Sequence, residues 1–349
     1  MPETMKAIIK TVAGYGAKLE EVKIPDINDN EVLVNVKAAS ICGTDVHIYE
    51  WNKWAQSRIK NLPQILGHEM AGNVVKTGKN VKNIKEGDYV SAETHVSCGH
   101  CIQCLNGQKH ICSNLIILGV DTNGCFAEYI AVPESVCWKN SPLIPPHIAS
   151  VQEPLGNAVY ATLVEEVAGK TIAIVGDGPI GLFSTAVAKA CGASVVFFVG
   201  LNSYRLELAK KLGADFLINH DNENAVSIVL EKTGGYGADV VMDMAGTPGS
   251  IDDCFKMVRK GGRFTAFGIP SEPITIDYTN SIVFKGLTLY GINGRLIFDT
   301  WIKIREMLES GKLDISPVIT HTLKLEEFEK GFDLMTARTK VCGKVVLIP

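Results

Sequence analysis

The sequence lacks the features that would indicate nucleic acid, a membrane or an unfolded chain. Its 34 Lys and Arg residues are outnumbered by 38 Asp and Glu residues, so the net charge of −4 leaves no basic excess for a polyanion. No apolar run approaches the ~20 residues of a membrane span or forms the core of a signal peptide. The composition is 46% hydrophobic and 21% charged, without low-complexity bias. We expect a cytoplasmic globular protein that binds a small molecule, with no nucleic acid and no membrane.

The 349 residues suggest two domains, since a domain typically has about 100 to 200 residues. The first part alternates apolar and polar positions between turns, with little helical periodicity, and predicts strands at 6–10, 31–37, 71–77, 89–93 and 127–132. From residue 171, apolar strands alternate with helices. Strands are expected at 171–175, 195–199, 216–218, 240–244, 263–267 and 287–290, and helices at 180–190, 204–212, 225–232 and 250–258.

This alternation predicts an α/β protein whose second domain, residues 156–294, is a Rossmann-type doubly wound parallel sheet. Residues 1–155 form the β-rich first domain. A helix at 298–309 and a closing strand at 344–348 follow the parallel sheet, and we assign residues 295–349 back to the first domain.

The strongest chemical signal is a cluster of cysteines, Cys98, Cys101, Cys104 and Cys112. Clustered cysteines in a reducing compartment are typical of metal ligands, and short spacers let the backbone turn around one Zn²⁺. Four thiolates fill a tetrahedral site and leave no position for water or substrate. We therefore predict a structural zinc, with free buried cysteines as the alternative.

A second, looser set contains Cys42, followed by Thr44 and His47, then the pair His68 and Glu69. Glu153 lies far downstream. Cysteine, histidine and one carboxylate, from Glu69 or Glu153, would leave an open position on a metal, which is typical of a catalytic site. Taken alone, however, these residues are better explained by a core cysteine and a surface His–Glu pair than by a metal site.

A glycine-rich turn follows the strand at 171–175, with Gly176, Gly178 and Gly181 in a G-x-G-x-x-G pattern that opens a helix. Glycines permit the tight turn and close backbone approach, and the helix N-terminus receives a dinucleotide pyrophosphate. Because the pattern sits between a strand and a helix of a βαβ unit, it predicts a dinucleotide site.

The acid that this fingerprint places at the end of the second strand, to bind the ribose hydroxyls, is missing. Gly200 stands there, followed by Asn202, Ser203 and Arg205, which could bind a 2′-phosphate. NADP use is therefore plausible. The alternative is that the acid is dispensable and NAD is preferred.

These three features together resemble the zinc-dependent medium-chain alcohol and polyol dehydrogenases, over the whole chain. Within that family, several segments are most similar to the branch that oxidises threonine. They are 41–49, Trp51 and Trp54, 93–95, 126–129, 154–159, 204–209 and 291–295 with Phe298, Thr300 and Trp301.

The resemblance implies a GroES-like first domain that carries catalysis and two zinc ions per subunit. It assigns the catalytic zinc to Cys42, His68 and Glu69, with Glu153 close enough to exchange with bound water, and a proton relay to Thr44 and His47. It also implies a homotetramer and NAD. The implied cofactor residues, besides the glycine turn, are Ile180, Gly200, Arg205, Phe267, Gly268, Ile269, Ile292 and Asn293.

The reaction that the resemblance implies is oxidation of the 3-hydroxyl of L-threonine to 2-amino-3-oxobutanoate. An amino-acid substrate needs partners for its ammonium and carboxylate groups, and His95 and Arg295 are the candidates. An ion pair between domains or subunits is the alternative role for Arg295. Asp177, within the glycine turn, departs from the family pattern without an evident reason.

Three rival functions remain open. A polyol dehydrogenase acting on sorbitol or 2,3-butanediol is the nearest, since Glu153-Pro154-Leu155 also resembles those enzymes. A zinc-ribbon binding module without enzymatic activity would explain the cysteines but not the glycine turn. A quinone-reductase-like relative without catalytic zinc would not need Cys42, His68 and Glu69 together.

Overall fold

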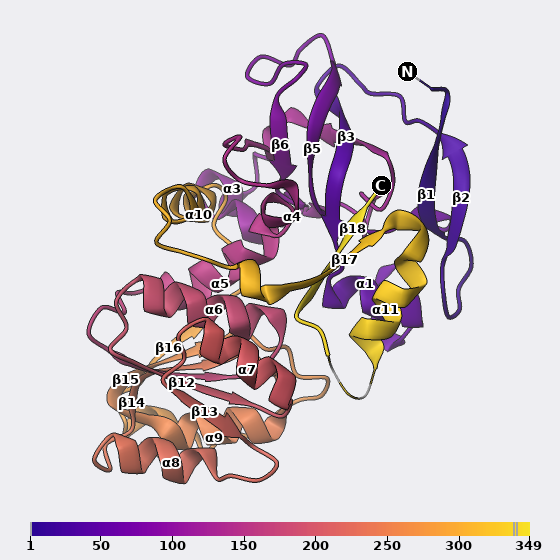
Figure 1. Ribbon diagram of the computed structural model, residues 1–349. Coiled ribbons are helices and arrows are strands. Elements are labelled where there is room, and N and C mark those ends of the chain that lie inside the picture. Colours follow the sequence, from indigo (N-terminus) through magenta and orange to yellow (C-terminus); the bar gives the residue numbers. More distant parts are fainter. Residues whose placement is uncertain (1, 338, 340) are drawn as a thin grey trace.

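The computed structural model describes residues 2–337, 339 and 341–349 (Figure 1). It has two lobes, each built on its own large sheet, and both chain ends lie in the lobe that contains β3 and β5. Within the described residues, no helix is long and apolar enough to cross a membrane.

The first lobe is mostly antiparallel. Its main sheet has the order β10-β6-β5-β3-β18-β17, with β9 also paired to β3. The strands are β3 (Glu31–Ser40), β5 (Glu69–Thr77), β6 (Tyr89–Ala92), β9 (Tyr129–Pro133), β10 (Cys137–Lys139), β17 (Ile319–Lys324) and β18 (Lys344–Ile348). The last strand, β18, pairs antiparallel with β3 through Val346 and Ser40, which brings the end of the chain beside residues near its start.

Two smaller sheets flank this one. One has the order β2-β1-β4, and the other joins β7 to β8. Their strands are β1 (Thr4–Lys10), β2 (Lys18–Lys23), β4 (Gln64–Ile65), β7 (His95–Val96) and β8 (Ile116–Ile117).

The second lobe contains a six-stranded parallel sheet of order β13-β12-β11-β14-β15-β16. The strands are β11 (Thr171–Val175), β12 (Val195–Gly200), β13 (Phe216–Asn219), β14 (Ala238–Asp243), β15 (Val258–Ala266) and β16 (Thr288–Gly291). They read as near-continuous apolar runs because helices cover both faces. The covering helices include α6 (Pro179–Ala190), α7 (Ser203–Lys211), α8 (Ala225–Lys232) and α9 (Pro248–Met257).

This strand order, 3-2-1-4-5-6 when the strands are numbered along the chain, is that of the dinucleotide-binding fold. The predicted fold class, a β-rich domain together with a doubly wound parallel sheet, is confirmed. The order reverses between β11 and β14, and ligands bind at such a point, outside the carboxyl ends of the strands.

The expectation of little helix in the first part was wrong. The missed helices are α1 (Gly43–Glu50), α2 (Lys53–Arg58), α3 (Ile102–Leu105), α4 (Pro146–Ala149), α5 (Gln152–Leu163) and, near the C-terminus, α11 (Phe328–Thr336). Helices α2, α3 and α4 have only four to six residues, too few for an apolar stripe to repeat, so periodicity does not reveal them. The predicted helix at 298–309 is α10 (Asp299–Glu309).

Helix α5 connects the two lobes without a linker. It runs continuously through residues 155 and 156, and Leu155, Ala158 and Val159 are buried in the same core as the parallel sheet. Figure 1 shows α5 and the neighbouring α6 between the two sheets, with α10 beside α5. Residues carried by α5 therefore lie between the lobes.

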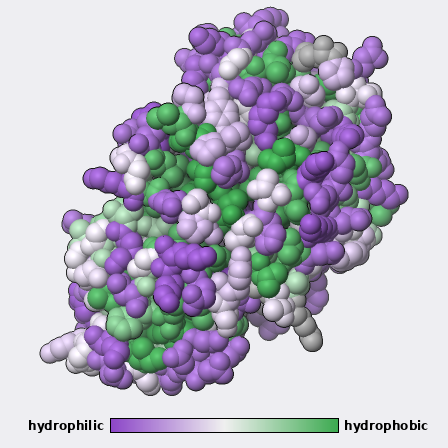
Figure 2. Space-filling model, viewed as in Figure 1, coloured by the Kyte–Doolittle hydropathy of each residue, from purple (hydrophilic) through white to green (hydrophobic). Residues whose placement is uncertain are grey.

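On the face shown in Figure 2, hydrophilic residues cover much of both lobes, and hydrophobic residues lie between them and across the middle of the view. The exposed apolar side chains include Ile102 and Leu105 of α3, which are 72% and 73% exposed.

Candidate functional site

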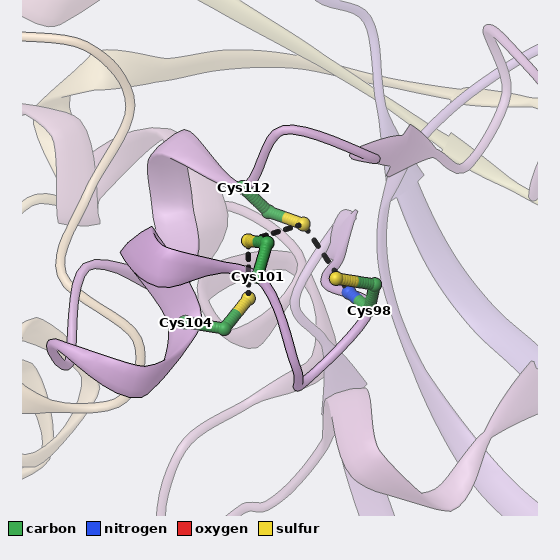
Figure 3. Close-up of side chains that lie close together, drawn as sticks. All are labelled: Cys98, Cys101, Cys104 and Cys112. Carbon is green, nitrogen blue, oxygen red and sulfur yellow. Dashed lines mark hydrogen bonds between the residues drawn. The ribbon is translucent and has the colours of Figure 1, made fainter.

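The four clustered cysteines converge in the structure. Figure 3 shows their sulfur atoms pointing toward one another from the loop around α3 and from the segment after it, and all four Sγ atoms lie within 4.8 Å of one another. The Sγ–Sγ distances are 3.4 Å for Cys101–Cys104 and 3.7 Å for Cys101–Cys112. A tetrahedral zinc with Zn–S bonds of about 2.3 Å requires sulfur separations of about 3.8 Å, so the cluster fits the ion.

Backbone groups of the same loop favour thiolates. The backbone N–H of His100 contributes most to lowering the pKa of Cys98 to about 5. Burial opposes this shift, and the backbone N–H of Cys101 adds to it. Backbone N–H groups, that of Cys104 first, also lower the pKa of Cys101. Thiolate is the form that binds metal, so the backbone favours that form at Cys98 and Cys101, whereas burial raises the pKa of Cys104 to about 11. The four sulfurs leave no open position on an ion.

The second cluster joins Cys42, His68 and Glu69, whose ligand atoms lie within 4.8 Å of one another. Cys42 is the N-cap of α1, and Glu69 is the first residue of β5. The intervening turn depends on Gly67, whose backbone is left-handed at φ +90° and whose Cα packs against the Phe126 ring. A sulfur, an imidazole and a carboxylate suit zinc and leave one position open.

Buried charged groups hold these three side chains in place. Asp45 accepts a hydrogen bond from the Cys42 backbone N–H at 2.8 Å and lies 3.3 Å from His68 Nδ1. Although burial opposes it, the charges of Asp45 and Cys42 raise the pKa of His68. On the other side, Lys344 Nζ donates to Glu69 Oε1 at 2.7 Å and to the Ile41 carbonyl at 2.9 Å.

Sequence reasoning missed Asp45 and Lys344. Asp45 could have been found, because an acid three residues after the N-cap is a helix-start signal. Lys344 could not, because it is 275 residues from its partner and only the pairing of β18 with β3 brings it there.

Glu153 belongs to a buried ionic network between the lobes. Its Oε1 lies 2.7 Å from Arg295 Nη1, and Arg295 also forms a two-point ion pair with Glu93. Asn157 accepts from Arg295 at 3.0 Å, and Trp301 Nε1 donates to Glu93 at 2.9 Å. The ion pair that was the alternative role for Arg295 is thus present. The Arg295 guanidinium contacts Glu93 and Glu153 of the same chain.

Burial shifts two titrating groups beside this network. It raises the pKa of Glu153 to about 7, against the attraction of Arg295, so this carboxyl can hold or release a proton near neutral pH. Burial, together with the nearby Arg295 charge, lowers the pKa of His95 to about 2, so its imidazole is neutral. Among the described residues, the buried His95 Nδ1 has no hydrogen-bond partner.

The predicted relay residues share one face of α1. Thr44 and His47 are three positions apart, which places them one above the other on a helix. Thr44 is half-buried and His47 is exposed, and the His47 ring contacts Asn52 through Nδ1 at 2.8 Å. The pair leads from Cys42, at the start of α1, outward to solvent.

The glycine turn lies between β11 and α6. Gly176 is left-handed at φ +121°, and a Cβ there would be 2.8 Å from the Ala245 nitrogen. A Cβ at Gly181 would be 2.0 Å from the Gly176 carbonyl oxygen. Gly178 is the N-cap of α6 and has open space around it. Two glycines therefore close the turn, while the third leaves room for a ligand at the helix N-terminus, beside Ile180.

The other predicted cofactor residues lie at or after the carboxyl ends of strands β12, β15 and β16. They are Gly200 and Arg205, Phe267, Gly268 and Ile269, and Ile292 and Asn293. Ile269 is 91% exposed, and Ile292 is buried. Arg205 is buried too, and its Nε donates to the Cys342 carbonyl at 2.9 Å.

The chain matches two protein-family models. Residues 28–145 match the alcohol dehydrogenase GroES-like domain, and residues 179–310 match the zinc-binding dehydrogenase model. Curated relatives resemble it over their full length. The L-threonine 3-dehydrogenase of Bacillus velezensis is 56% identical over 99% of both chains, and that of Bacillus subtilis is 52% identical over 99% of both.

Solved structures share the whole fold at lower identity. A zinc-binding dehydrogenase from Sinorhizobium meliloti bound to NADP has a TM-score of 0.91 at 27% identity, covering 100% of both chains. An Escherichia coli alcohol dehydrogenase complexed with NADH has a TM-score of 0.91 at 28%, also covering 100% of both. The 2R,3R-butanediol dehydrogenase of Bacillus subtilis has a TM-score of 0.89 at 27%, covering 99% of both.

Proposed function

Since the chain belongs to the zinc-binding dehydrogenase family, we propose that it oxidises the 3-hydroxyl group of L-threonine to 2-amino-3-oxobutanoate, with NAD(P) as hydride acceptor. The predictions of this family, of an oxidoreductase acting on CH–OH, and of zinc with NAD(P) are confirmed. The observation that supports threonine as the substrate is the full-length identity of 56% and 52% to two L-threonine 3-dehydrogenases. The identity to the butanediol dehydrogenase is only 27%.

We assign two zinc sites per subunit. Cys98, Cys101, Cys104 and Cys112 would hold a structural ion, and the cluster of Cys42, His68 and Glu69 would hold a catalytic one. Bound zinc supplies a Lewis acid that makes the substrate hydroxyl easier to deprotonate. The open coordination position of the second cluster supports this division of roles, because the four-cysteine cluster has none.

The cofactor would lie along the carboxyl ends of the parallel strands. Gly176, Gly178, Ile180 and Gly181 would hold the pyrophosphate at the N-terminus of α6, and Ile292 and Asn293 after β16 would hold the nicotinamide. When bound, NAD(P) accepts the hydride. Phe267, Gly268 and Ile269 after β15 would complete the site, and Gly200 and Arg205 would lie at the ribose.

The substrate proton needs a path to water, and the geometry of α1 supports one. Thr44 receives the proton beside the cluster, and His47 passes it to solvent from the exposed side of the same helix. Glu153, whose pKa of about 7 follows from burial, holds a second exchangeable proton at the same site. It is positioned by Arg295 at 2.7 Å.

The substrate's charged groups require two further contacts. We propose that the neutral His95 accepts a hydrogen bond from the ammonium group, since its Nδ1 is buried without a partner among the described residues. A direct contact between Arg295 and the substrate carboxylate stays a prediction. It would have to be added to the contacts that Arg295 makes with Glu93, Glu153 and Asn157.

We further propose a cytoplasmic homotetramer. The exposed apolar residues Ile102 and Leu105 of α3, and Phe284, which is 68% exposed, support contacts between subunits. We also propose the division into a catalytic domain of residues 1–155 with 295–349 and a dinucleotide-binding domain of residues 156–294. The pairing of β18 with β3 supports the assignment of the C-terminal segment.

The deciding experiment measures initial rates at the absorbance band of the reduced nicotinamide. L-threonine and 2,3-butanediol are compared as substrates, before and after chelator treatment and with zinc added back. We expect threonine oxidation that a chelator abolishes and zinc restores. If only the diol reacts, the threonine proposal and the role of His95 are wrong, while the zinc and cofactor sites remain.

A further inference from the structure

We propose that Asp177, in the glycine turn, replaces the missing acid at the end of β12 and makes this enzyme prefer NAD to NADP. The inference rests on the nicotinamide cofactor of the proposed function. It reverses the expectation that Gly200 opens the site to a 2′-phosphate. It also gives Asp177 a role.

The side chain of Asp177 fills the space that a residue 200 side chain would occupy. A Cβ built on Gly200 would lie 2.6 Å from Asp177 Cβ and 2.9 Å from Asp177 Oδ2. Its three nearest heavy atoms all belong to Asp177. The backbone of Gly200 is not left-handed, so Asp177 is the obstacle to a side chain there. Glycine at 200 and aspartate at 177 are therefore complementary.

The carboxylate of Asp177 is held in this place. Its Oδ2 accepts hydrogen bonds from the backbone N–H groups of Leu201 at 2.9 Å and Asn202 at 2.8 Å. Its Oδ1 lies 3.6 Å from Arg205 Nη1. The Asp177 side chain is still 18% exposed, which leaves part of the group accessible to a ligand. A fixed carboxylate thus stands at the end of β12, although it comes from the turn after β11.

Arg205 is engaged by the same carboxylate. Its side chain is buried, it donates to the Cys342 carbonyl at 2.9 Å, and its nearest acid is Asp177. A 2′-phosphate would have to displace that acid to use the arginine, and would meet a negative charge on approach. Ribose hydroxyls, in contrast, can donate to a carboxylate, as they do to the usual acid of this fold. The two cofactors should therefore differ in affinity.

The test is a binding titration without substrate, so it does not depend on threonine oxidation. NADH and NADPH are titrated into the full-length, zinc-loaded protein, and the fluorescence of the reduced nicotinamide gives each Kd. We expect NADH to bind at least about tenfold more tightly, or about 1.4 kcal/mol. Asp177→Asn keeps the size of the side chain, and it should reduce this ratio to about threefold or less, because the repulsion of the phosphate is removed.

Asp252→Asn is the matched control, since it removes an exposed carboxylate that pairs with Lys256 on α9. It should leave the ratio unchanged. Equal affinities in the unaltered protein, or a ratio that Asp177→Asn does not move, would overturn the proposal. The second result would mean that Asp177 only orders the loop at Leu201 and Asn202.

A second variant moves the acid back to the strand. Gly200→Asp alone should weaken both cofactors, because the new side chain meets Asp177. Gly200→Asp combined with Asp177→Gly removes the clash, because the Asp177 Cβ itself lies 2.6 Å from the Cβ built on Gly200, and it should restore the preference for NADH. Thermal unfolding shows whether the combined variant folds. If it folds but binds NADH and NADPH equally well, positions 177 and 200 are not complementary. A protein that prefers NADH but leaves threonine unoxidised refutes the proposed function and not this inference.

Discussion

The two candidate metal centres differ in where their ligands come from. The four-cysteine cluster is contained in residues 98–112, and the groups that favour its thiolates are backbone N–H donors of the same loop. The cluster of Cys42, His68 and Glu69 combines the start of a helix with the start of a strand. Its supporting charges come from Lys344 and, between the lobes, from Arg295.

This difference reflects what each centre has to do. A closed site needs four ligands and no more, so one loop can make it. An open site keeps a free position, and its buried carboxylates and cations must be balanced by one another because an unpaired buried charge is costly. Such balance requires residues from several segments. Local spacing therefore encodes the first centre, and only the assembled fold completes the second.

The sharpest way to separate the centres is Cys42→Ser. We expect a loss of turnover of at least about a thousandfold, since a hydroxyl is a poor zinc ligand and the activating ion would be lost. Metal analysis should show one zinc per chain remaining. Cys191→Ser, at a thiol outside both clusters, should keep two ions and full activity. If Cys42→Ser retains both ions, Cys42 is not a ligand.

The converse change is Cys104→Ser in the closed cluster. We expect the loss of one zinc and a fall in Tm of roughly 10 °C, because binding of a structural ion contributes to folding. Protein that remains folded at low temperature should still oxidise threonine. Calorimetry and initial rates check this. An unchanged Tm with one ion missing would show that this zinc does not stabilise the fold.

Glu93→Gln tests the ionic network behind the open centre. It leaves Arg295 buried with one of its two carboxylate partners removed, and we expect a stability loss of about 3 kcal/mol. Urea unfolding measures it, with Lys256→Gln on the surface as control. Combining Glu93→Gln with Arg295→Met should cost less than the sum of the single changes. Additive effects would argue against coupling between these residues.

His47→Asn addresses the proton path along α1. We expect turnover to fall about tenfold and its pH profile to move to higher pH, because proton release would then depend more on hydroxide. Both zinc ions should remain bound. Rates measured across pH, with metal content determined in parallel, check this. An unmoved profile would remove His47 from the path.

The smallest expected effect is on substrate preference. His95→Ala should lower kcat/KM for threonine relative to 2,3-butanediol by about fivefold. Only threonine has an ammonium group that can donate a hydrogen bond to the imidazole. His147→Ala, far from the clusters in the sequence, serves as control. Equal losses for both substrates would place His95 outside the substrate's ammonium contact.

The fold was largely predictable because its signals are local. The apolar strands β11 and β12 and the helices between the parallel strands repeat with regular periods. The helices α2, α3 and α4 were missed because four to six residues do not reveal a period, and α5, which is as long as α6, runs through the position where a boundary was expected. Boundaries between packed lobes depend on contacts that distant residues make.

The sequence by itself determined the four-cysteine cluster, the glycine turn and the order of strands and helices, since each depends on residues close together in the chain. It could not reveal that Lys344 contacts Glu69, that Glu93 and Glu153 flank Arg295, or that Asp177 lies against Gly200. Those contacts exist because separate strands and turns end side by side in space. Only the tertiary structure decides them, because charge balance and steric fit depend on distance in space and not on distance along the chain.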